Sequence, residues 1–320
     1  MTGNPTKHTP RRQGALFRAR EHAIFAALVA CAAFSIFVTI AIIAVLFSEA
    51  ARFFSLPDVS IVEFLTSTEW NPLQGTDRSY GMWPLVTGTL MVTAISALVS
   101  VPLGVITAIY LSEYARPRVR AVLKPILEIL AGIPTVVYGF FALTIITPIF
   151  LQKPIELITG KPGASVFELY NSTAAGIAVG IMCLPTVVSL SEDALRAVPR
   201  SLREGAYGLG ATRFDVAVRV VFPAALSGIV AACILAIARA VGETMIVAIA
   251  AGQSAQIATD PTQGSQTMTA YMVQIFLGDA TFGSVEYHSS YAVGATLFTM
   301  TLALTLIGNW VLRRFREVYG

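Results

Sequence analysis

Six long apolar runs dominate this chain, and each is long enough to cross a lipid bilayer as a helix. Hydrophobic residues make up 55% of the 320 residues, whereas charged residues make up only 13%. A soluble domain of this size could not bury so much apolar surface, and the mean hydropathy of +0.70 agrees with this. The sequence therefore predicts an all-α membrane protein with six transmembrane helices. The runs cover about residues 23–47, 83–111, 121–151, 173–198, 218–252 and 290–312.

The first apolar run follows a basic N-terminal segment, residues 1–22. A secretory signal peptide has a similar arrangement, but its apolar core is usually only about 7–15 residues long. Residues 23–47 exceed that length, and no clean small-residue cleavage site follows them. We therefore expect residues 23–47 to be retained as the first transmembrane helix.

The distribution of lysine and arginine predicts the orientation of the chain. Of the 22 such residues, 17 fall on one side of the predicted topology, four fall on the other side, and Arg239 falls within a span. Cytoplasmic loops carry the excess of these residues, so both termini are expected in the cytoplasm. The expected division is a cytoplasmic N-terminus (1–22), a first helix (23–47), an external segment (48–82), a five-helix core (83–312) with a cytoplasmic loop at 199–223, and a cytoplasmic tail (313–320).

Several classes of function find no support in the composition. A net charge of +3 is too small to suggest nucleic-acid binding. Cys31, Cys183 and Cys233 all lie in apolar runs and the histidines are scattered, so neither disulfides nor a metal site is expected. No serine, cysteine or histidine constellation suggests nucleophilic catalysis, and no G-x-x-x-x-G-K-[ST] phosphate-binding loop is present. The chain is expected to be neither an enzyme nor a holder of any cofactor.

The last external segment, residues 253–289, contains no lysine or arginine. Such a surface would not by itself attract a free anion, although a separate protein that delivers the substrate would relax this requirement. Met268–Phe276 is apolar enough to form a short helix, which we expect to lie on the membrane surface.

The predicted cytoplasmic loop at 199–223 contains signals for two helices. Ser201 and Glu204 have the spacing of a capping box, which predicts the start of a short helix. Gly205 and Ala206 give this helix a surface of small side chains, which would allow another surface to approach closely. Gly210 is expected to end the helix in a left-handed turn. The loop is either an ordinary helical hairpin packed under the bundle or a docking element for a cytoplasmic partner.

Arg239 and Glu243 are charged residues in the middle of the fifth apolar run. The helical rise would place Arg239 roughly 24 Å beyond Pro223, which is past the middle of the bilayer. Charged residues in a membrane span usually face the interior of a bundle or a watery path. The pair is either an intrahelical ion pair or part of a substrate pathway. Arginine before glutamate is the less favourable order for an i,i+4 pair, which favours the pathway.

The cytoplasmic loop resembles the EAA loop of ABC importer permeases. The resemblance rests on Glu204-Gly205-Ala206, on Gly210 six positions after the glutamate, and on Pro223 nineteen positions after it. In that family the loop inserts a coupling helix into a groove on an ATPase subunit, so the resemblance implies an ATPase-coupling role for these five residues. The second motif residue is usually alanine, and Gly205 keeps this position small.

Further segments resemble the phosphate-specific ABC importer permeases, which have the type I, MetI-like fold. These segments are Glu128–Gly139, the loop just described and Arg239–Thr244. The segments 69–72, 80–84 and 88–90 are similar to the C-type (PstC) subunit of that family. The resemblance covers about residues 60–312.

The resemblance implies a membrane-spanning subunit of a phosphate importer in the bacterial plasma membrane. Its expected partners are an A-type permease subunit, two copies of a cytoplasmic ATP-binding subunit, and an external phosphate-binding protein, besides membrane lipid. It also implies that Arg239, Glu243 and Thr244 belong to the substrate pathway, since a guanidinium group can bind a phosphate oxyanion through paired hydrogen bonds. Glu243 would moderate that attraction or pair with the A-type subunit.

Two alternatives stay open at this point. The same architecture could carry another substrate, such as sulfate, molybdate or an amino acid. An ion-coupled secondary transporter is the other alternative, and it would have no use for the docking loop at Glu204–Pro223.

Overall fold

The computed structural model describes residues 15–57, 59–72, 78–163 and 166–314. The chain divides into two units, Met1–Ser48 and Glu49–Gly320. The boundary falls within helix α1 (Ala15–Phe54), an unbroken helix whose part Arg20–Phe54 is long and apolar enough to span a membrane. No side chain within residues 20–48 breaks the apolar pattern with proline or glycine, so the helix continues throughout this range.

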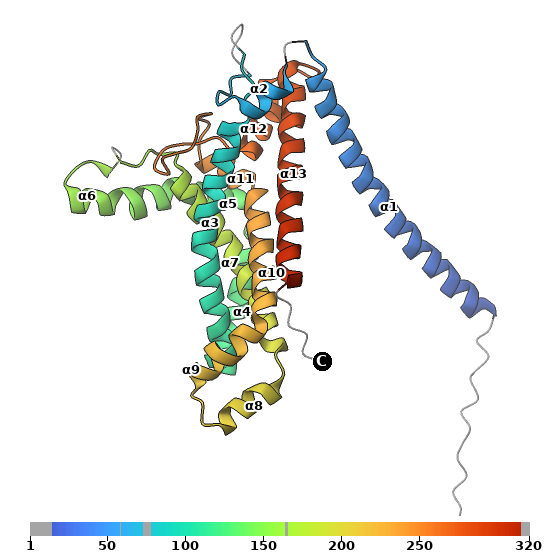
Figure 1. Ribbon diagram of the computed structural model, residues 1–320, viewed down its shortest axis with the longest axis vertical. Helices are drawn as coiled ribbons and strands as arrows, with labels where there is room; N and C mark the ends of the chain where they lie inside the picture. Colours follow the sequence, from blue (N-terminus) through green and yellow to red (C-terminus); the bar gives the residue numbers. More distant parts are fainter. Residues whose placement is uncertain (1–14, 58, 73–77, 164–165, 315–320) are drawn as a thin grey trace, which may run out of the picture. The chain divides into compact units, whose positions relative to one another are not determined.

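The second unit is a bundle of helices of very different lengths (Figure 1). The long helices are apolar along most of their length, as a lipid environment requires. Several of them contain π-helical turns, labelled η. The elements are α2 (Ile61–Thr66), α3 (Trp83–Ile109), η1 (Tyr110–Tyr114), α4 (Pro117–Gly132), α5 (Thr135–Phe141), η2 (Ala142–Gln152), α6 (Lys153–Thr159), α7 (Ser172–Ala197), α8 (Arg200–Gly208), α9 (Arg213–Asp215), η4 (Val216–Val221), α10 (Phe222–Val241), α11 (Met245–Ala250), α12 (Met268–Gln274), η5 (Ile275–Asp279) and α13 (Val285–Arg314).

The prediction of six spans is confirmed in number, because six of the described helical stretches are long and apolar enough to cross a membrane. Two apolar runs that we expected to be continuous are broken. The third run divides into α4 and α5 at Ile133-Pro134, since the residue before proline is forced into an extended conformation. The fifth run divides into α10 and α11 around Gly242, and its spanning part, Arg213–Val241, ends before Glu243.

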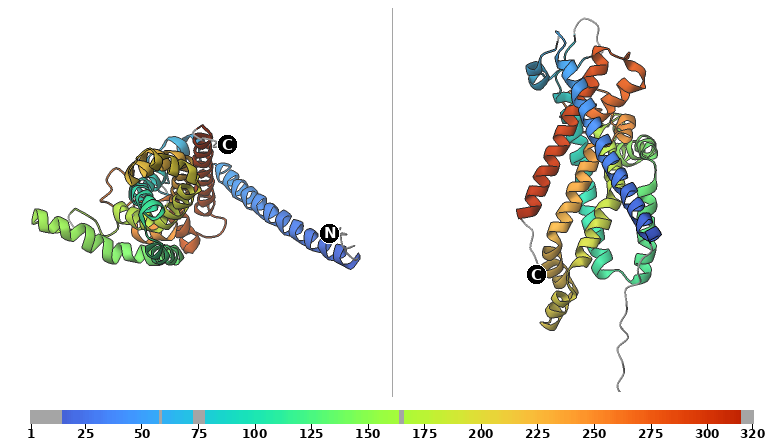
Figure 2. Two further views of the ribbon diagram at one scale, coloured as in Figure 1. Left: turned by 90° about the horizontal axis from the view of Figure 1, so that it is seen from below. Right: turned by 90° about the vertical axis from the view of Figure 1, so that its right-hand side faces the viewer.

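Helix α7 lies at the centre of the second unit and packs against α3, α10, α4 and α5. Two glycines on one face of α7 allow the close approach of α3. A β-carbon on Gly176 would lie 2.6 Å from the side chain of Ile95, and one on Gly180 would lie 2.9 Å from that of Val99. This is the small-residue packing that membrane helices use. Helices α10 and α13 run side by side along the bundle (Figures 1 and 2).

One end of the second unit, which carries α2 and α12, is closed by an aromatic cluster. Trp70 packs edge to face against Tyr271 at a ring distance of 5.0 Å, and Phe53 packs similarly against Tyr80 at 5.3 Å. Burial raises the pKa of Tyr271, so its phenol group stays protonated and shares a hydrogen bond of 2.7 Å with Ser289. The residues that resembled the C-type subunit thus include members of this buried cluster.

The expectation that Met268–Phe276 lies on the membrane surface is wrong. A helix does form there, but Met268 and Tyr271 are almost fully buried, and α12 packs against α13, α11 and α3. The Met268 N–H group donates a hydrogen bond of 3.0 Å to the Thr89 hydroxyl group on α3. The first turn of this segment is therefore buried within the bundle, whereas Phe276 at its end is 50% exposed.

Candidate functional site

The loop between α7 and α10 lies at the end of the second unit opposite α2 and α12 (Figure 1). The expected short helix is α8, but the predicted capping box is wrong. Helix α8 begins at Arg200 with Pro199 as its N-cap, and no side chain caps it. Ser201 is already inside the helix, because the fixed backbone angle of Pro199 lets the helix begin two residues earlier. Gly210 ends this segment with φ of +81°, which confirms the left-handed turn.

Helix α8 has one side that packs against the bundle and one side that is free. Leu202 and Ala206 pack against a buried cluster to which α3, α7, η4 and α10 contribute. Glu204 and Gly205 are exposed, and a β-carbon on Gly205 would find no atom within 4 Å. Leu209, just beyond the helix, has 91% of its surface exposed. The side of α8 that carries Glu204 and Gly205 is therefore open to solvent in this chain.

Arg203 fastens α8 to the rest of the bundle, and sequence analysis did not single it out. Its guanidinium group donates to the backbone carbonyls of Leu195 and Val198, at 2.8 and 2.6 Å, at the end of α7. It also forms an ion pair of 3.1 Å with Glu113 in η1. The last carbonyl groups of a helix have no partner within it, so Arg203 satisfies two of them and joins three elements.

Pro223 lies where the loop enters the fifth span. Thr212 caps the entry, since its hydroxyl group accepts a hydrogen bond of 3.2 Å from the Asp215 N–H group. The π-helical turn η4 ends directly before Phe222-Pro223. A proline inside a helix lacks an N–H group and clashes with the preceding turn, and the wider π turn accommodates both defects.

Arg239 and Glu243 do not lie on one continuous helix as expected, so the alternative that they form an intrahelical ion pair is wrong. Helix α10 ends at Val241, so Glu243 falls in the break before α11. The Arg239 guanidinium group donates to the Thr186 hydroxyl group on α7 at 3.2 Å, and its side chain is otherwise exposed. Among the acidic side chains that the structure describes, none forms an ion pair with Arg239.

Glu243 holds the break between α10 and α11 in place. Its carboxylate accepts hydrogen bonds from the N–H groups of Met245 and Ile246, at 3.0 and 3.2 Å, which cap the start of α11. Its backbone carbonyl accepts a bond of 2.6 Å from the Thr269 hydroxyl group on α12. Thr244 donates to the Gly242 carbonyl at 3.2 Å. Because the first N–H groups of a helix lack partners, the carboxylate has a structural role at this position.

A second charged group, on α4 and α7, was missed in the sequence. Glu192 on α7 is only 1% exposed and forms an ion pair of 2.6 Å with Arg120 on α4. Arg196, one turn further along α7, lies 3.9 Å from the same carboxylate. A glutamate inside an apolar run was the available signal, but its partner lies on a different helix.

Comparison with known proteins identifies the family of this chain. Residues 100–317 match the family described as binding-protein-dependent transport system inner membrane component. The chain belongs to this family. It is 36% identical over 285 residues to a probable ABC transporter permease protein, YqgH, of Bacillus subtilis, and the match covers 89% of this chain and 88% of the relative.

Two further relatives of this permease have a substrate in their names. It is 34% identical over 263 residues to the phosphate transport system permease protein PstC of Mesorhizobium japonicum, with 78% of each chain covered. It is 31% identical to a probable protein of the same name from Methanocaldococcus jannaschii, over 74% of this chain and 77% of the relative.

Solved structures show the fold of this permease. A bacterial ABC transporter involved in the import of the acidic polysaccharide alginate matches with a TM-score of 0.67 at 16% identity, over 93% of this chain and 98% of that one. An inward-facing conformation of the MetNI methionine ABC transporter matches with a TM-score of 0.51 at 19% identity, over 74% and 98%. The chain is thus a transporter subunit with the fold of an ABC importer permease, not an enzyme.

Proposed function

We propose that this permease is a membrane-spanning subunit of an ATP-driven phosphate importer and forms half of its translocation pathway. The PstC relatives, each similar over most of the chain, support phosphate as the substrate. The observation that carries the proposal is the state of Arg239. It is a permanent cation at the end of an apolar helix, bound to a neutral hydroxyl group and to no described acid.

A guanidinium group in this state can bind an oxyanion. Its planar set of donors matches two phosphate oxygens, and the interaction is stronger where water is scarce. The hydrogen bond to Thr186 uses one donor and orients the group, while the other donors stay available. The side chain is exposed on the isolated chain, so an anion or a second permease subunit can reach it.

Glu243 and Thr244 contribute to the same site by shaping the backbone next to Arg239. The carboxylate of Glu243 caps α11, so it fixes where that helix begins, with three residues between it and the end of α10. Its negative charge lowers the net attraction for an anion to a smaller extent, so the cap is its main contribution to the site.

The loop from α8 to Pro223 is the proposed coupling element. In this proposal the exposed side of α8, with Glu204 and Gly205, enters a groove on a cytoplasmic ATP-binding subunit, of which the complex holds two copies. Arg203 then transmits the motion of α8 to α7 and η1 through its three polar contacts. Ala206, Gly210 and Pro223 give this element its packing, its turn and its entry into α10.

The remaining parts of the assembly follow from the same proposal. An A-type permease subunit forms the other half of the pathway, and an external phosphate-binding protein delivers the anion to the end that carries α2 and α12. The chain lies in the bacterial plasma membrane with both termini in the cytoplasm, as the excess of lysine and arginine predicts. The proposal assigns no cofactor to this chain.

Uptake of radiolabelled phosphate by vesicles that contain all four components tests this function. Each component is omitted in turn, and excess sulfate is added as a competitor. We expect uptake that requires ATP, the binding protein and this chain, and that sulfate leaves unchanged. If sulfate blocks uptake, the permease carries another oxyanion. If uptake continues without ATP, transport is not driven by an ATP-binding subunit.

A further inference from the structure

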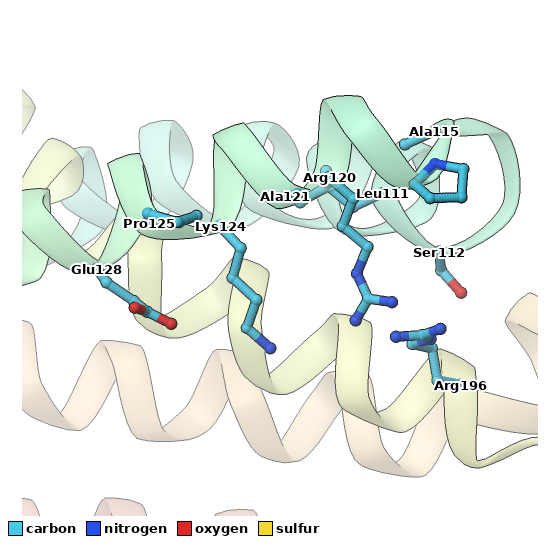
Figure 3. Close-up of a pocket in the computed structure, with 10 residues that line it drawn as sticks. Leu111, Ser112, Ala115, Arg120, Ala121, Lys124, Pro125, Glu128 and Arg196 are labelled. Carbon is cyan, nitrogen blue, oxygen red and sulfur yellow. The ribbon is translucent and has the colours of Figure 1, made fainter.

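Two adjoining cavities lie between α4 and α7. The larger, with a volume of about 520 Å³, is lined by Arg120, Lys124, Glu128 and Arg196 among others (Figure 3). The smaller, of about 180 Å³, is also lined by Lys124 and Glu128. The two cavities adjoin at these shared side chains, and we call them together the α4–α7 groove.

The α4–α7 groove begins next to Arg239. Thr186, which accepts the hydrogen bond from Arg239, lines the smaller cavity together with Ser189 and Glu192. Arg196 lines the larger cavity and lies in the last turn of α7, directly before the loop that carries α8. The groove therefore follows one face of α7 from the proposed anion site towards the coupling end of the bundle.

The charges along the α4–α7 groove favour an anion. Three cationic side chains line it, and Figure 3 shows Arg120 and Arg196 with their guanidinium groups turned towards each other. Glu192 pairs closely with Arg120 and only distantly with Arg196, at 2.6 and 3.9 Å. Lys124 forms no ion pair with any acid that the structure describes. Glu128 lies one turn further along α4, and together with Glu192 it offsets only part of the positive charge of the lining.

We propose that the α4–α7 groove is a second anion site, in which a phosphate-class oxyanion leaving Arg239 is held by Lys124 and Arg196 before it reaches the cytoplasm. This inference rests on the proposed function for its direction and its ligand. A chain of weak sites lets an anion cross a low-dielectric region without being held tightly at any one of them. Glu192 keeps Arg120 neutralised, so the site stays weak enough to release its anion.

The double variant Lys124→Gln/Arg196→Gln, in the complete four-component vesicles, tests the inference. We expect the maximal rate of phosphate uptake to fall by about tenfold or more, since two cations facing the anion are lost. The external concentration for half-maximal uptake should stay unchanged, because the binding protein captures the anion on the other side. The conservative variant Lys124→Arg/Arg196→Lys should restore the rate.

Arg118→Gln is the matched control, since Arg118 lies on α4 but is exposed and does not line the groove. It should transport like the wild type. Uptake by the double glutamine variant at the wild-type rate would overturn the inference while leaving the proposed function intact. If the wild type carries a different oxyanion, the proposed function fails, and the same variants with that anion still decide whether the groove is used.

A second experiment covers the case in which the double variant does not assemble. Lys124→Cys in the assembled complex is treated with a methanethiosulfonate reagent that adds either an ammonium or a sulfonate group, with the treated wild type as reference for the native cysteines. We expect the ammonium group to restore uptake and the sulfonate group to reduce it. Equal uptake after both treatments would overturn the inference.

Discussion

Arg239 and Glu243 are four positions apart in the sequence but act on different parts of the structure. Arg239 extends from the last turn of α10 to the hydroxyl group of Thr186 on α7. Glu243 instead accepts two backbone hydrogen bonds and thereby fixes the start of α11. The arginine is the proposed anion-binding group, and the glutamate shapes the backbone that follows α10.

The role of Glu243 as an acceptor can be separated from its charge. Glu243→Gln keeps a side-chain oxygen for the N–H groups of Met245 and Ile246, so phosphate uptake should stay within about threefold of the wild type. Glu243→Ala leaves both N–H groups without that partner, at a cost of about 1 kcal/mol or more, and uptake should fall by about tenfold. Equal loss in both variants, in complexes shown to be assembled, would mean that the negative charge itself is required.

The sequence analysis predicted the number of spans but not the break at Gly242. Apolar residues continue from Met245 to Ala251, so hydropathy alone could not separate α11 from α10. The pairing of Arg120 with Glu192, and the burial of Tyr271, could not be predicted because they depend on helices that are distant in the chain. The left-handed turn at Gly210 could be predicted, because glycine adopts such a conformation without steric cost.

Helix α8 is the element that connects the proposed ATPase contact to the membrane bundle. Its inner side is held by Leu202, Ala206 and the contacts of Arg203, while its outer side carries Glu204 and Gly205. An element of this kind transmits motion only if the fastening is rigid.

Loss of Arg203 should uncouple ATP hydrolysis from phosphate uptake. In Arg203→Gln, the bonds to Leu195, Val198 and Glu113 are weakened, so phosphate uptake should fall by about tenfold while basal ATP hydrolysis by the assembled complex continues. Arg219→Gln is the control, since that side chain is highly exposed and its pair with Asp215 contributes little. Parallel loss of hydrolysis and uptake in Arg203→Gln would contradict this role.

A bulky residue at Gly205 should prevent docking without disturbing the chain itself. Nothing lies within 4 Å of a β-carbon at this position, so Gly205→Tyr should leave the melting temperature of the isolated permease unchanged. The ATP-binding subunit should no longer copurify with the variant, because the small side of α8 is filled. Copurification at wild-type yield would show that α8 docks by another surface.

Within the second unit, the closed end, the proposed anion site and the coupling helix α8 follow one another along the bundle. The end with α2 and α12 is closed by the aromatic cluster around Trp70 and Tyr271. Arg239 lies further along the bundle, beside the centre of α7, and the α4–α7 groove leads from there towards α8. On the proposed route, an anion passes Arg239 before it enters the α4–α7 groove.

The measurement that tests this claim most directly is phosphate uptake by vesicles containing Arg239→Gln, compared with Arg239→Lys and the wild type. Glutamine keeps a hydrogen-bond donor for Thr186 but removes the charge. We therefore expect assembled complexes of all three, no measurable uptake with glutamine, and partial uptake with lysine, which keeps the charge without the paired donors. Wild-type uptake by assembled Arg239→Gln would contradict the account.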